Sequence, residues 1–506
     1  MRDSAGHPKT GIVITAIGSV SAFRWSVESG VQGDFQLILP HGSYTIQPDL
    51  KTTAEPAIEV HVLAGQVNHV SLSLTNDSRS GVWRSNTVAP RPSLGRFAES
   101  YSLAGALLNE DPATVTAPLD FTGAQNTRIP LASQYTFSWT ATEFSLEGMN
   151  ATDPYQPGRL VVLPDVQDLD EIKVESSRGS GVSGAFAVET GLFLQTPRNR
   201  WHGELSTADT GASLSSSNLP IPADRGILLQ PQEYNWFTRD HVALGGPLGR
   251  RADMYFSGTG QCASETVPIA QQGQNQNSRL LFGNFGLRYQ LTAKDQIEFL
   301  LTGSCIDLSN WGEPVGLEAL TGWRMIPAYE SPYGFNGLAE VDHLDFIQAA
   351  WTRQLPRSFH SGVLQVRYGA SIAHLDTDPS TANQGQSRTE LLDGTVTGAP
   401  PLTNLAVRQR QSVRVVLQPG NVRFGSNTHR FVIGGSWERS NVANRFNAPS
   451  GPDLITAAGV PAYAVELNTP LNSRERVESF SAFARDQISL TPWLSMDVGV
   501  IGEFSR

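Results

Sequence analysis

From about residue 200 onward, the chain is a series of strand-length runs in which apolar and polar residues alternate. In the run from 363 to 372, the even positions are apolar or small, whereas the odd ones include Gln365, Arg367 and Ser371. Successive side chains of a β-strand point to opposite faces, so each run has one apolar and one polar face. The alternation predicts antiparallel sheet with two chemically different sides.

The connections between these runs differ in length in a regular way. The predicted strands are residues 200–212, 234–245, 251–264, 278–290, 295–306, 344–355, 360–375, 408–418, 429–441, 475–490 and 493–506. Their connections are alternately long and short, at about 20, 5, 12, 4, 37, 4, 32, 10, 33 and 2 residues. Structureless loops beyond about 15 residues are uncommon in compact domains, whereas outer-membrane barrels have short turns on one side and long loops on the other. The pattern favours a transmembrane β-barrel over a soluble sandwich.

Composition agrees with a mostly-β chain of about two to four domains. Gly and Pro are plentiful, at 47 and 31 of 506 residues, and clean helical periodicity is nearly absent. No stretch approaches the roughly 18 apolar residues of a membrane-spanning helix, which excludes a helical membrane protein. The net charge of -11 argues against a nucleic-acid partner held by phosphate contacts.

Only two cysteines occur, Cys262 and Cys305, which excludes a disulfide scaffold and a multi-cysteine metal site. They fall on the third and fifth predicted strands, so the strand between them separates them by about 9–10 Å. A disulfide bond does not span that distance. We therefore expect two unpaired cysteines.

Residues 1–75 form a separate unit of short runs. Strands are expected at 11–16, 41–46, 58–62 and 70–74, and a turn followed by a strand at 30–40, divided by Gly and Pro, which suggests a small sandwich. The order Gly-Asp-Phe, then Leu-Pro-x-Gly-x-Tyr-x-Ile, then Val-x-Val-x-x-Gly resembles the carboxypeptidase-regulatory-like domain. That resemblance implies a prealbumin-like β-sandwich without catalytic residues.

The segment from 76 to 98 is polar and is expected to be a linker. Residues 99–196 contain both helix-like and strand-like runs, which is typical of an α+β unit. A short helix is expected at 101–108, followed by strand-like pieces at 144–146, 160–163, 171–174 and 185–194.

Several motifs in these segments occur in a recognisable order. Phe144-Ser-Leu-Glu-Gly-Met-Asn-Ala-Thr-Asp is similar to the plug motif Phe-x-x-Asp-Gly-x-Asn-x-x-Asp, with Glu147 where Asp is usual. Leu163-Pro to Val174 is similar to a later plug stretch, and Asn199-Arg-Trp-His-Gly to the entry into the first barrel strand. Gly245-Gly-Pro-Leu and the hairpin around Asp486-Gln resemble barrel turns. Together they resemble the TonB-dependent outer-membrane receptors with a regulatory-like domain, the Oar-like group.

The resemblance implies an outer-membrane barrel of 22 strands filled by a plug, with residues 99–196 as the plug and 197–506 as about 11 barrel strands. It implies plug-motif roles for Glu147, Gly148, Asn150 and Asp153, and barrel-entry roles for Asn199, His202 and Gly203. The N-terminal domains would be periplasmic. The implied partners are the TonB–ExbB–ExbD energy-coupling system, outer-membrane lipid, and an extracellular small ligand or oligosaccharide. No cofactor is implied.

Two further segments are candidates for binding. A TonB-contact segment should be extended and lie before the plug, and Thr87, Val88 and Pro90 fit, although a plain linker explains them equally well. The long predicted loop 307–343 carries aromatic residues that suit stacking on a sugar or another flat ligand, or else form the loop's own small core. These aromatic residues are Trp311, Trp323, Tyr329 and Tyr333.

No catalytic constellation is present, so we do not expect an enzyme. Gly179-Ser-Gly-Val-Ser-Gly fits G-x-G-x-x-G, but a strand-like run follows it where a dinucleotide site needs a helix. The acidic residues of the plug could bind a cation or act in acid–base catalysis, but the favoured interpretation is solvated or hydrogen-bonded carboxylates. Zinc-peptidase and serine-elbow motifs are absent. The alternative to a receptor is a secreted or surface all-β binding or adhesion protein.

Both ends of the sequence suggest a longer parent protein. The start lacks a basic region followed by an apolar core, so it is not a secretory signal. The last predicted strand reaches Arg506, and bacterial single-chain barrels have even strand numbers. We therefore expect the chain to be the N-terminal half of a receptor.

Overall fold

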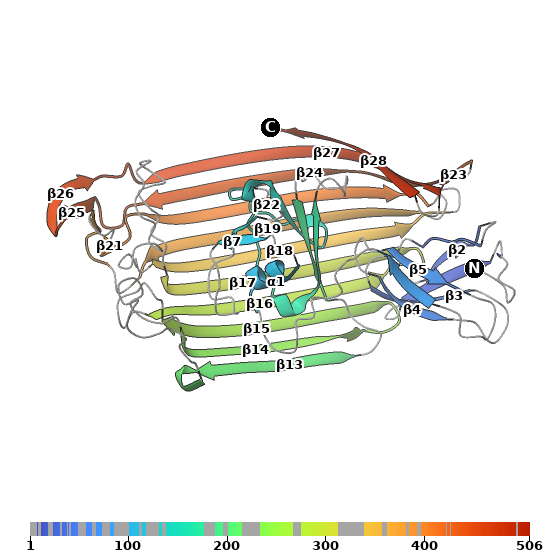
Figure 1. The fold of residues 1–506 in the computed structure, drawn as a ribbon, viewed down its shortest axis with the longest axis horizontal. Coiled ribbons are helices and arrows are strands. Elements are labelled where there is room, and N and C mark those ends of the chain that lie inside the picture. The colour runs from blue at the N-terminus through green and yellow to red at the C-terminus, as the bar shows by residue number, and fades with distance from the viewer. Residues whose placement is uncertain are drawn as a thin grey trace.

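The protein consists of a large sheet of long strands, a smaller unit lying against one face of it, and another small unit beside the ends of its strands (Figure 1). The computed structural model describes the residues that follow, and the statements below refer to them. They are 8, 12–18, 24–30, 33–37, 39, 42–48, 57–62, 67–72, 81–85, 101–110, 114–117, 131–133, 138–176, 188–195, 201–214, 233–266, 275–311, 338–356, 362–380, 384–391, 396–420, 422–425, 427–491 and 494–506.

The large sheet contains eleven strands that pair in chain order, each antiparallel to the next. They are β13 (His202–Gly211), β14 (Glu233–Pro247), β15 (Ala252–Thr266), β16 (Asn275–Gln290), β17 (Asp295–Trp311), β18 (Leu338–Gln354), β19 (Val363–Pro379), β22 (Thr403–Gln418), β24 (Asn427–Asn447), β27 (Leu471–Thr491) and β28 (Leu494–Ser505). Short β23 (Val422–Phe424) also pairs with β24, and η3 (Ala212–Leu214) follows β13. Each of the eleven predicted strands corresponds to one of these, so the predicted mostly-β fold class with a large antiparallel sheet is confirmed.

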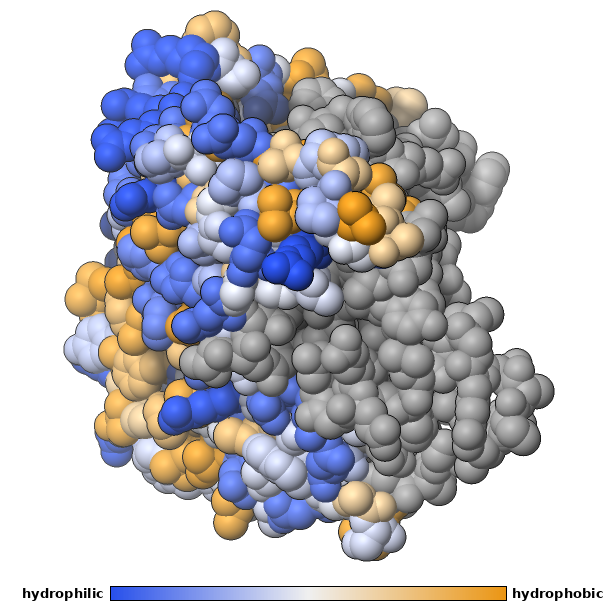
Figure 2. All heavy atoms as spheres, turned by 90° about the vertical axis from the view of Figure 1, so that its left-hand side faces the viewer, coloured by the Kyte–Doolittle hydropathy of each residue, from blue (hydrophilic) through white to orange (hydrophobic). Residues whose placement is uncertain are grey.

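The two faces of the large sheet are chemically inverted relative to a soluble protein. On the face turned away from the smaller unit, apolar side chains are exposed, for example Leu301 at 46% and Tyr368 at 41%. On the inner face, polar side chains are buried, with Gln296 at 2% and Thr302 at 1% exposed. Viewed along the strands, apolar residues gather along the lower left margin, which is the outward side (Figure 2). The outer face therefore suits an apolar surrounding medium and the inner face a polar interior.

The sheet has a short-turn end and a long-connection end. The short-turn end carries the connections 248–251, 291–294, 355–362, 419–426 and 492–493. The turn at 291–294 shows how such a connection is fixed: the Thr292 hydroxyl accepts hydrogen bonds from the backbone N–H groups of Lys294 and Asp295, both at 3.1 Å. All other connections between neighbouring strands of the sheet lie at the opposite end, so the predicted alternation of connection lengths is present.

Two of the long connections build a second sheet, which the sequence did not predict. Its order is β21 (Val396–Thr397), β20 (Arg388–Glu390), β25 (Asp453–Ala457) and β26 (Val460–Val465), and β20 pairs with β25 in parallel. The buried Asp453 carboxylate joins the two connections, because it accepts hydrogen bonds from Ser387 Oγ at 2.7 Å and Thr389 Oγ1 at 2.9 Å. This sheet lies at the left of Figure 1, beyond the strand ends.

The smaller unit on the inner face is called the plug below. It has α1 (Leu103–Glu110) and a sheet ordered β10 (Met149–Asn150), β9 (Thr142–Leu146), β12 (Val188–Leu194) and β11 (Leu169–Ser176). The short elements are β7 (Val115–Ala117), β8 (Leu131–Ser133), η1 (Trp139–Ala141) and η2 (Val166–Asp168). The expected strand at 160–163 is wrong. That run is instead a buried, non-strand segment with one isolated bridge at Leu160, and its apolar side chains belong to the core shared with the large sheet.

The N-terminal unit has a four-stranded sheet ordered β2 (Arg24–Glu28), β1 (Val13–Gly18), β3 (Gly42–Pro48) and β4 (Ile58–Val62). The turn expected at the start of 30–40 is present, because Gly33 has a φ of 71° and its N–H donates to the Gly30 carbonyl. The strand expected to follow it is wrong at 34–37, where no strand forms. β5 (Val67–Ser71) pairs with β6 (Gly81–Ser85), so part of the expected linker 76–98 is a strand.

Two smaller expectations are also decided by the structure. Cys262 and Cys305 are both free, and β16 lies between their strands, which confirms that they are unpaired. Among the described residues, no helix has the length and apolar character needed to span a bilayer.

Candidate functional site

The β9–β10 hairpin of the plug touches the inner face of the large sheet through its turn. Glu147 and Gly148 both have positive φ, 51° and 75°, as a two-residue type I′ turn requires. The Glu147 carbonyl accepts a hydrogen bond from Arg367, and the Gly148 carbonyl accepts one from Arg414 Nη1 at 3.1 Å. The Glu147 side chain points back into the plug, where Oε1 accepts from the Leu194 N–H at 2.7 Å.

The other two residues of the plug motif lie at the same interface. Asn150 Nδ2 donates to Glu438 Oε2 at 3.2 Å. Asp153 pairs with Arg408, and both side chains are 3% exposed. The second oxygen of Asp153 accepts from the N–H of Tyr155 at 2.8 Å, which fixes the local turn. The structure therefore brings all four motif residues to the plug surface that faces β19, β22 and β24.

A second contact centres on Arg239 of β14, which is 2% exposed. Its Nη2 lies 2.6 and 2.7 Å from the two oxygens of Asp165, the N-cap of η2. Nη1 donates to Gln261 Oε1 at 3.0 Å, and the Tyr101 ring lies 4.3 Å from the guanidinium carbon. Arg239 therefore contacts the plug through Asp165 and Tyr101, and the neighbouring barrel strand through Gln261.

Asp168, one turn further along, completes this contact. It accepts hydrogen bonds from Tyr255 Oη at 2.9 Å and from Asn284. Burial and the neighbouring Asp165 carboxylate raise the pKa of Asp168. Burial also works against ionisation of Asp165, but His241, whose Nδ1 lies 3.6 Å from Asp165 Oδ2, and the charge of Arg239 hold its pKa below the usual range. Asp165 is therefore the stronger acid of the two.

Asp165, Asp168 and His241 have the composition of a metal site, since one potential ligand atom from each lies within 4.8 Å of the others. Those atoms are already engaged, however. Asp165 is neutralised by Arg239, Asp168 accepts from Tyr255 and Asn284, and His241 Nδ1 is hydrogen-bonded to Thr259 Oγ1 at 2.8 Å. A metal ion would have to displace the arginine. The cluster therefore joins the plug to the large sheet through charge-assisted hydrogen bonds.

A third group of charges surrounds Glu143 of β9. Glu143 stands beside Glu189 of β12 in parallel register and also experiences the charge of Glu438 on β24. Burial, reinforced by these two carboxylates and opposed by Arg410 and Arg414, raises the pKa of Glu143 to about 8. At neutral pH this carboxyl group is therefore mostly protonated.

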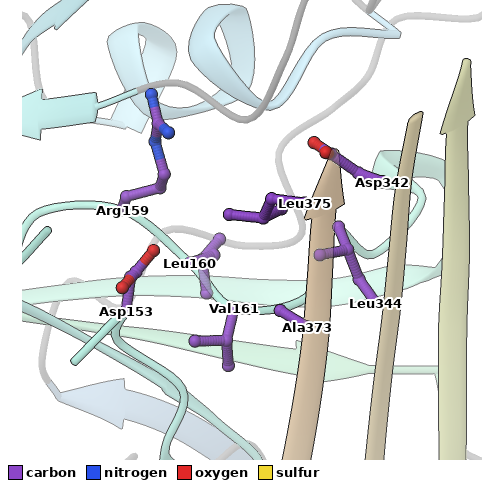
Figure 3. A pocket seen from close by; sticks show the side chains of 8 residues that line it. All are labelled: Asp153, Arg159, Leu160, Val161, Asp342, Leu344, Ala373 and Leu375. Carbon is purple, nitrogen blue, oxygen red and sulfur yellow. The ribbon is translucent and has the colours of Figure 1, made fainter. Parts of the chain in front are cut away.

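A small cavity lies in the seam between the plug and strands β18 and β19 (Figure 3). Its volume of about 10 Å³ has room for a single water molecule. The lining residues are Asp153, Arg159, Leu160, Val161, Asp342, Leu344, Ala373 and Leu375. Sites for small molecules measure about 300 Å³ or more, so this cavity marks tight packing of the plug and does not hold a ligand.

Solved structures with the same arrangement exist. The outer-membrane transporter YddB from Escherichia coli matches 79% of this chain, with a TM-score of 0.55 and 12% identity. The ferric citrate transporter FecA matches 79% with a TM-score of 0.52 and 10% identity. The pyoverdine outer-membrane receptor FpvA from Pseudomonas aeruginosa matches 78% with a TM-score of 0.54 and 11% identity.

This chain has the fold of an outer-membrane transporter. The three matched structures carry the names of transporters and receptors, not of enzymes. This chain spans about half the length of each, 53%, 54% and 53% respectively. No protein-family model matches the sequence, and no curated protein does. The large sheet thus corresponds to barrel wall, and the unit on its inner face to a plug.

The remaining sequence-predicted residues are scattered. His202 and Gly203 begin the first barrel strand, opposite Gly245 and Leu244. Trp311 ends β17, at the long-connection end. Outside the described residues lie Asn199, the candidate TonB-contact residues Thr87, Val88 and Pro90, the loop aromatics Trp323, Tyr329 and Tyr333, and the glycine-rich stretch 179–184.

Sequence reasoning missed the arginines on the inner face of the barrel strands. Arg408, Arg410 and Arg414 of β22 share that face. Arg408 and Arg414 bind the plug, whereas Arg410 pairs with Glu438 of β24. A readable signal existed, because arginines at a spacing of two or four within an alternating strand share its polar face. The acidic residues of the plug were expected to be solvated or hydrogen-bonded. Asp153, Asp165 and Asp168 are hydrogen-bonded, and they are buried.

Replacing Gly148 with alanine is expected to loosen the β9–β10 hairpin by about 2–4 kcal/mol. The positive φ disfavours any side chain, and a Cβ would lie 2.5 Å from Arg367 Nη1 and displace that arginine from the Glu147 carbonyl. Hydrogen–deuterium exchange of residues 142–152 measures the change. Gly451→Ala is the matched control, because Gly451 has a φ of 76° with nothing within 4 Å of its Cβ position. Equal local effects of the two substitutions would rule out a role for Arg367.

Proposed function

We propose that this chain supplies the plug and eleven barrel strands of a TonB-dependent outer-membrane receptor that imports a ligand from outside the cell. In this proposal residues 1–75 form a regulatory-like sandwich, 76–98 a linker, 99–196 the plug and 197–506 barrel wall. The N-terminal units lie in the periplasm, and the long connections face outward. Outer-membrane lipid surrounds the apolar outer face.

The observation that carries the proposal is the inverted large sheet with a plug against its polar face. A soluble adhesion protein would have polar side chains on its outer strands, but here Ile347, Tyr368 and Val498 are exposed at 39%, 41% and 52%. Only an apolar medium makes such a continuous outer face favourable. The fold shared with outer-membrane transporters supports the same conclusion.

The contacts between plug and barrel suit a plug that is held firmly but can be released. They combine an apolar core with ion pairs such as Arg239–Asp165 and Arg408–Asp153. Water can replace polar contacts one at a time as the plug moves, whereas a wholly apolar interface would have to separate at once. The proposed energy source is TonB with ExbB and ExbD, acting on a segment before the plug such as Thr87, Val88 and Pro90.

The proposed ligand is an extracellular small molecule or oligosaccharide that docks at the long-connection end. The candidates for contact are the aromatic residues Trp311, Trp323, Tyr329 and Tyr333, and the sheet of β20, β21, β25 and β26 stands at the same end. No cofactor takes part, because the energy is supplied by the inner-membrane proton gradient.

Gel migration of the full-length protein from an outer-membrane fraction tests the proposal. Membrane barrels resist dodecyl sulfate until heated, so unheated and boiled samples are expected to migrate differently. A Lys substitution on the outer face, Leu301→Lys, is expected to reduce the folded band, since a charge there costs about 2–4 kcal/mol in the bilayer midplane. Recovery of the protein only in the soluble fraction, with no heat-dependent shift, would sink the idea.

A further inference from the structure

The N-terminal sheet packs against the short-turn end of the barrel strands. Val363, the first residue of β19, is 7% exposed and belongs to the same hydrophobic cluster as Ile14, Trp25 and Leu72 of the N-terminal unit. At the other side of the same turn, Gln354 Nε2 donates to the Ser26 carbonyl at 3.3 Å. The adjoining ends of β18 and β19 therefore contact the N-terminal unit, and Val363 takes part in its core.

The N-terminal unit also approaches the adjoining strands of the large sheet, around Tyr44 of β3. Tyr44 is 2% exposed. Burial raises its pKa, the charge of Arg288 opposes this rise, and the carboxylates of Glu298 and Asp253 add to it. These three charged residues lie on β15, β16 and β17, near the short turns. The N-terminal unit thus extends across the strand ends from β15 to β19, as its position beside those ends in Figure 1 shows.

One of the charged side chains near Tyr44, Asp253, is buried without hydrogen bonds. Asp253 is 0% exposed, and neither of its carboxylate oxygens has a hydrogen bond. Its nearest cation is Arg288, whose Nε lies 3.9 Å from Asp253 and 3.4 Å from Glu298. A buried carboxylate without hydrogen bonds is strongly disfavoured relative to a hydrated one. Any movement that admits water to Asp253 is therefore favoured by its charge.

We propose that the N-terminal unit is a releasable cap on the short-turn mouth of the barrel, held closed by apolar contact at Val363 and biased toward opening by the desolvated Asp253 carboxylate. The apolar contact favours the docked state, whereas hydration of the Asp253 carboxylate favours the undocked state. Release then uncovers the underside of the plug, which is the side from which the proposed energy-coupling partner approaches. The docking itself does not depend on the proposed function, whereas the purpose of its release does.

Thiol labelling of Val363→Cys tests the cap in the full chain. Cys262 and Cys305 are first replaced by serine, and the reagent is a small polar maleimide. If the cap opens transiently, the labelling rate follows the open population. The cysteine at 363 is expected to react at least about tenfold more slowly than a reference cysteine at exposed Arg250. Adding Trp25→Ala, which removes the buried core residue of the cap, is expected to bring the two rates together.

The charge is tested with Asp253→Asn in the same labelling background. Removing the buried carboxylate is expected to slow labelling at 363 by about tenfold. Asp240→Asn, an exposed acidic residue on neighbouring β14, is the matched control and is expected to change nothing. Rapid labelling without Trp25→Ala would overturn the docked cap, and an unchanged or faster rate in Asp253→Asn would overturn the charge bias. Neither labelling result depends on the heat-dependent gel migration that tests the proposed function. The cap and the proposed function can therefore be disproved independently.

Discussion

Arg239→Ala is expected to destabilise the plug within the barrel by about 3–5 kcal/mol, because it leaves the buried Asp165 carboxylate without its cation. The guanidinium also donates to Gln261 and lies against the Tyr101 ring, so the substitution removes several contacts at once. Loss of the arginine should increase exchange at the amides of residues 163–169 by several orders of magnitude. Hydrogen–deuterium exchange of the membrane-embedded protein measures this directly.

The matched control is Arg250→Ala, in the exposed turn between β14 and β15, which removes the same charge without touching the plug. A double-mutant comparison with Asp165→Asn isolates the ion pair. In that background the arginine substitution is expected to cost less than about 2 kcal/mol, since no buried charge is left behind. If Arg239→Ala and Arg250→Ala changed amide exchange at residues 163–169 equally, Arg239 would not hold the plug in the barrel.

The barrel strands were predictable because their information is local. Each strand carries its own two-residue period, and the alternation of long and short connections needs no knowledge of contacts across the sheet. The predicted facing holds as well: Ile297 and Leu301 are exposed on the outer face, opposite in direction to buried Gln296 and Thr302. A membrane strand has to be apolar on one side along its bilayer-crossing length, which keeps the signal strong.

At the long-connection end, strands of the large sheet extend further than the sequence predicted. β18 begins at Leu338 where 344 was predicted, and β24 continues to Asn447 where 441 was predicted. At such ends both faces become polar, as Arg474, Glu475 and Arg476 on β27 illustrate. Backbone pairing continues there without an apolar face, so the alternation that identifies a strand disappears before the strand does.

Contacts between distant parts of the chain were not predictable. Asp165 and Arg239 are 74 residues apart in sequence, and Asp153 and Arg408 are 255 apart. The plug motif itself was recognisable, and its Glu147-Gly148 pair agrees with the type I′ turn that the structure has. A local pattern does not identify the residues that the motif contacts. The backbone carbonyls of Glu147 and Gly148 accept hydrogen bonds from Arg367 and Arg414, which come more than two hundred residues later in the sequence.

Glu143→Gln is expected to abolish a loss of plug stability that the native protein undergoes as the pH rises. The folded-state pKa of Glu143 is raised to about 8 from an ordinary 4.5, so the folded plug holds a proton that the unfolded chain releases. The resulting stabilisation is fully present below pH 4.5 and is lost as the pH rises through about 8. Because Glu143 is only partly buried, the loss should be on the order of 3 kcal/mol.

The cause is a surplus of carboxylates where β9 and β12 meet the barrel wall. Glu143, Glu189 and Glu438 outnumber the guanidinium groups of Arg410 and Arg414, and Glu189 already accepts from Ser145 Oγ at 2.9 Å. One proton on Glu143 removes the excess charge, and glutamine reproduces that neutral form at every pH. The measurement is the exchange rate of amides 142–146 between pH 5 and 9, corrected for intrinsic rates. Glu204→Gln, at an exposed position of β13, should leave the native pH dependence intact. An equally steep pH dependence in Glu143→Gln would locate the titrating group elsewhere and remove Glu143 from the plug's pH response.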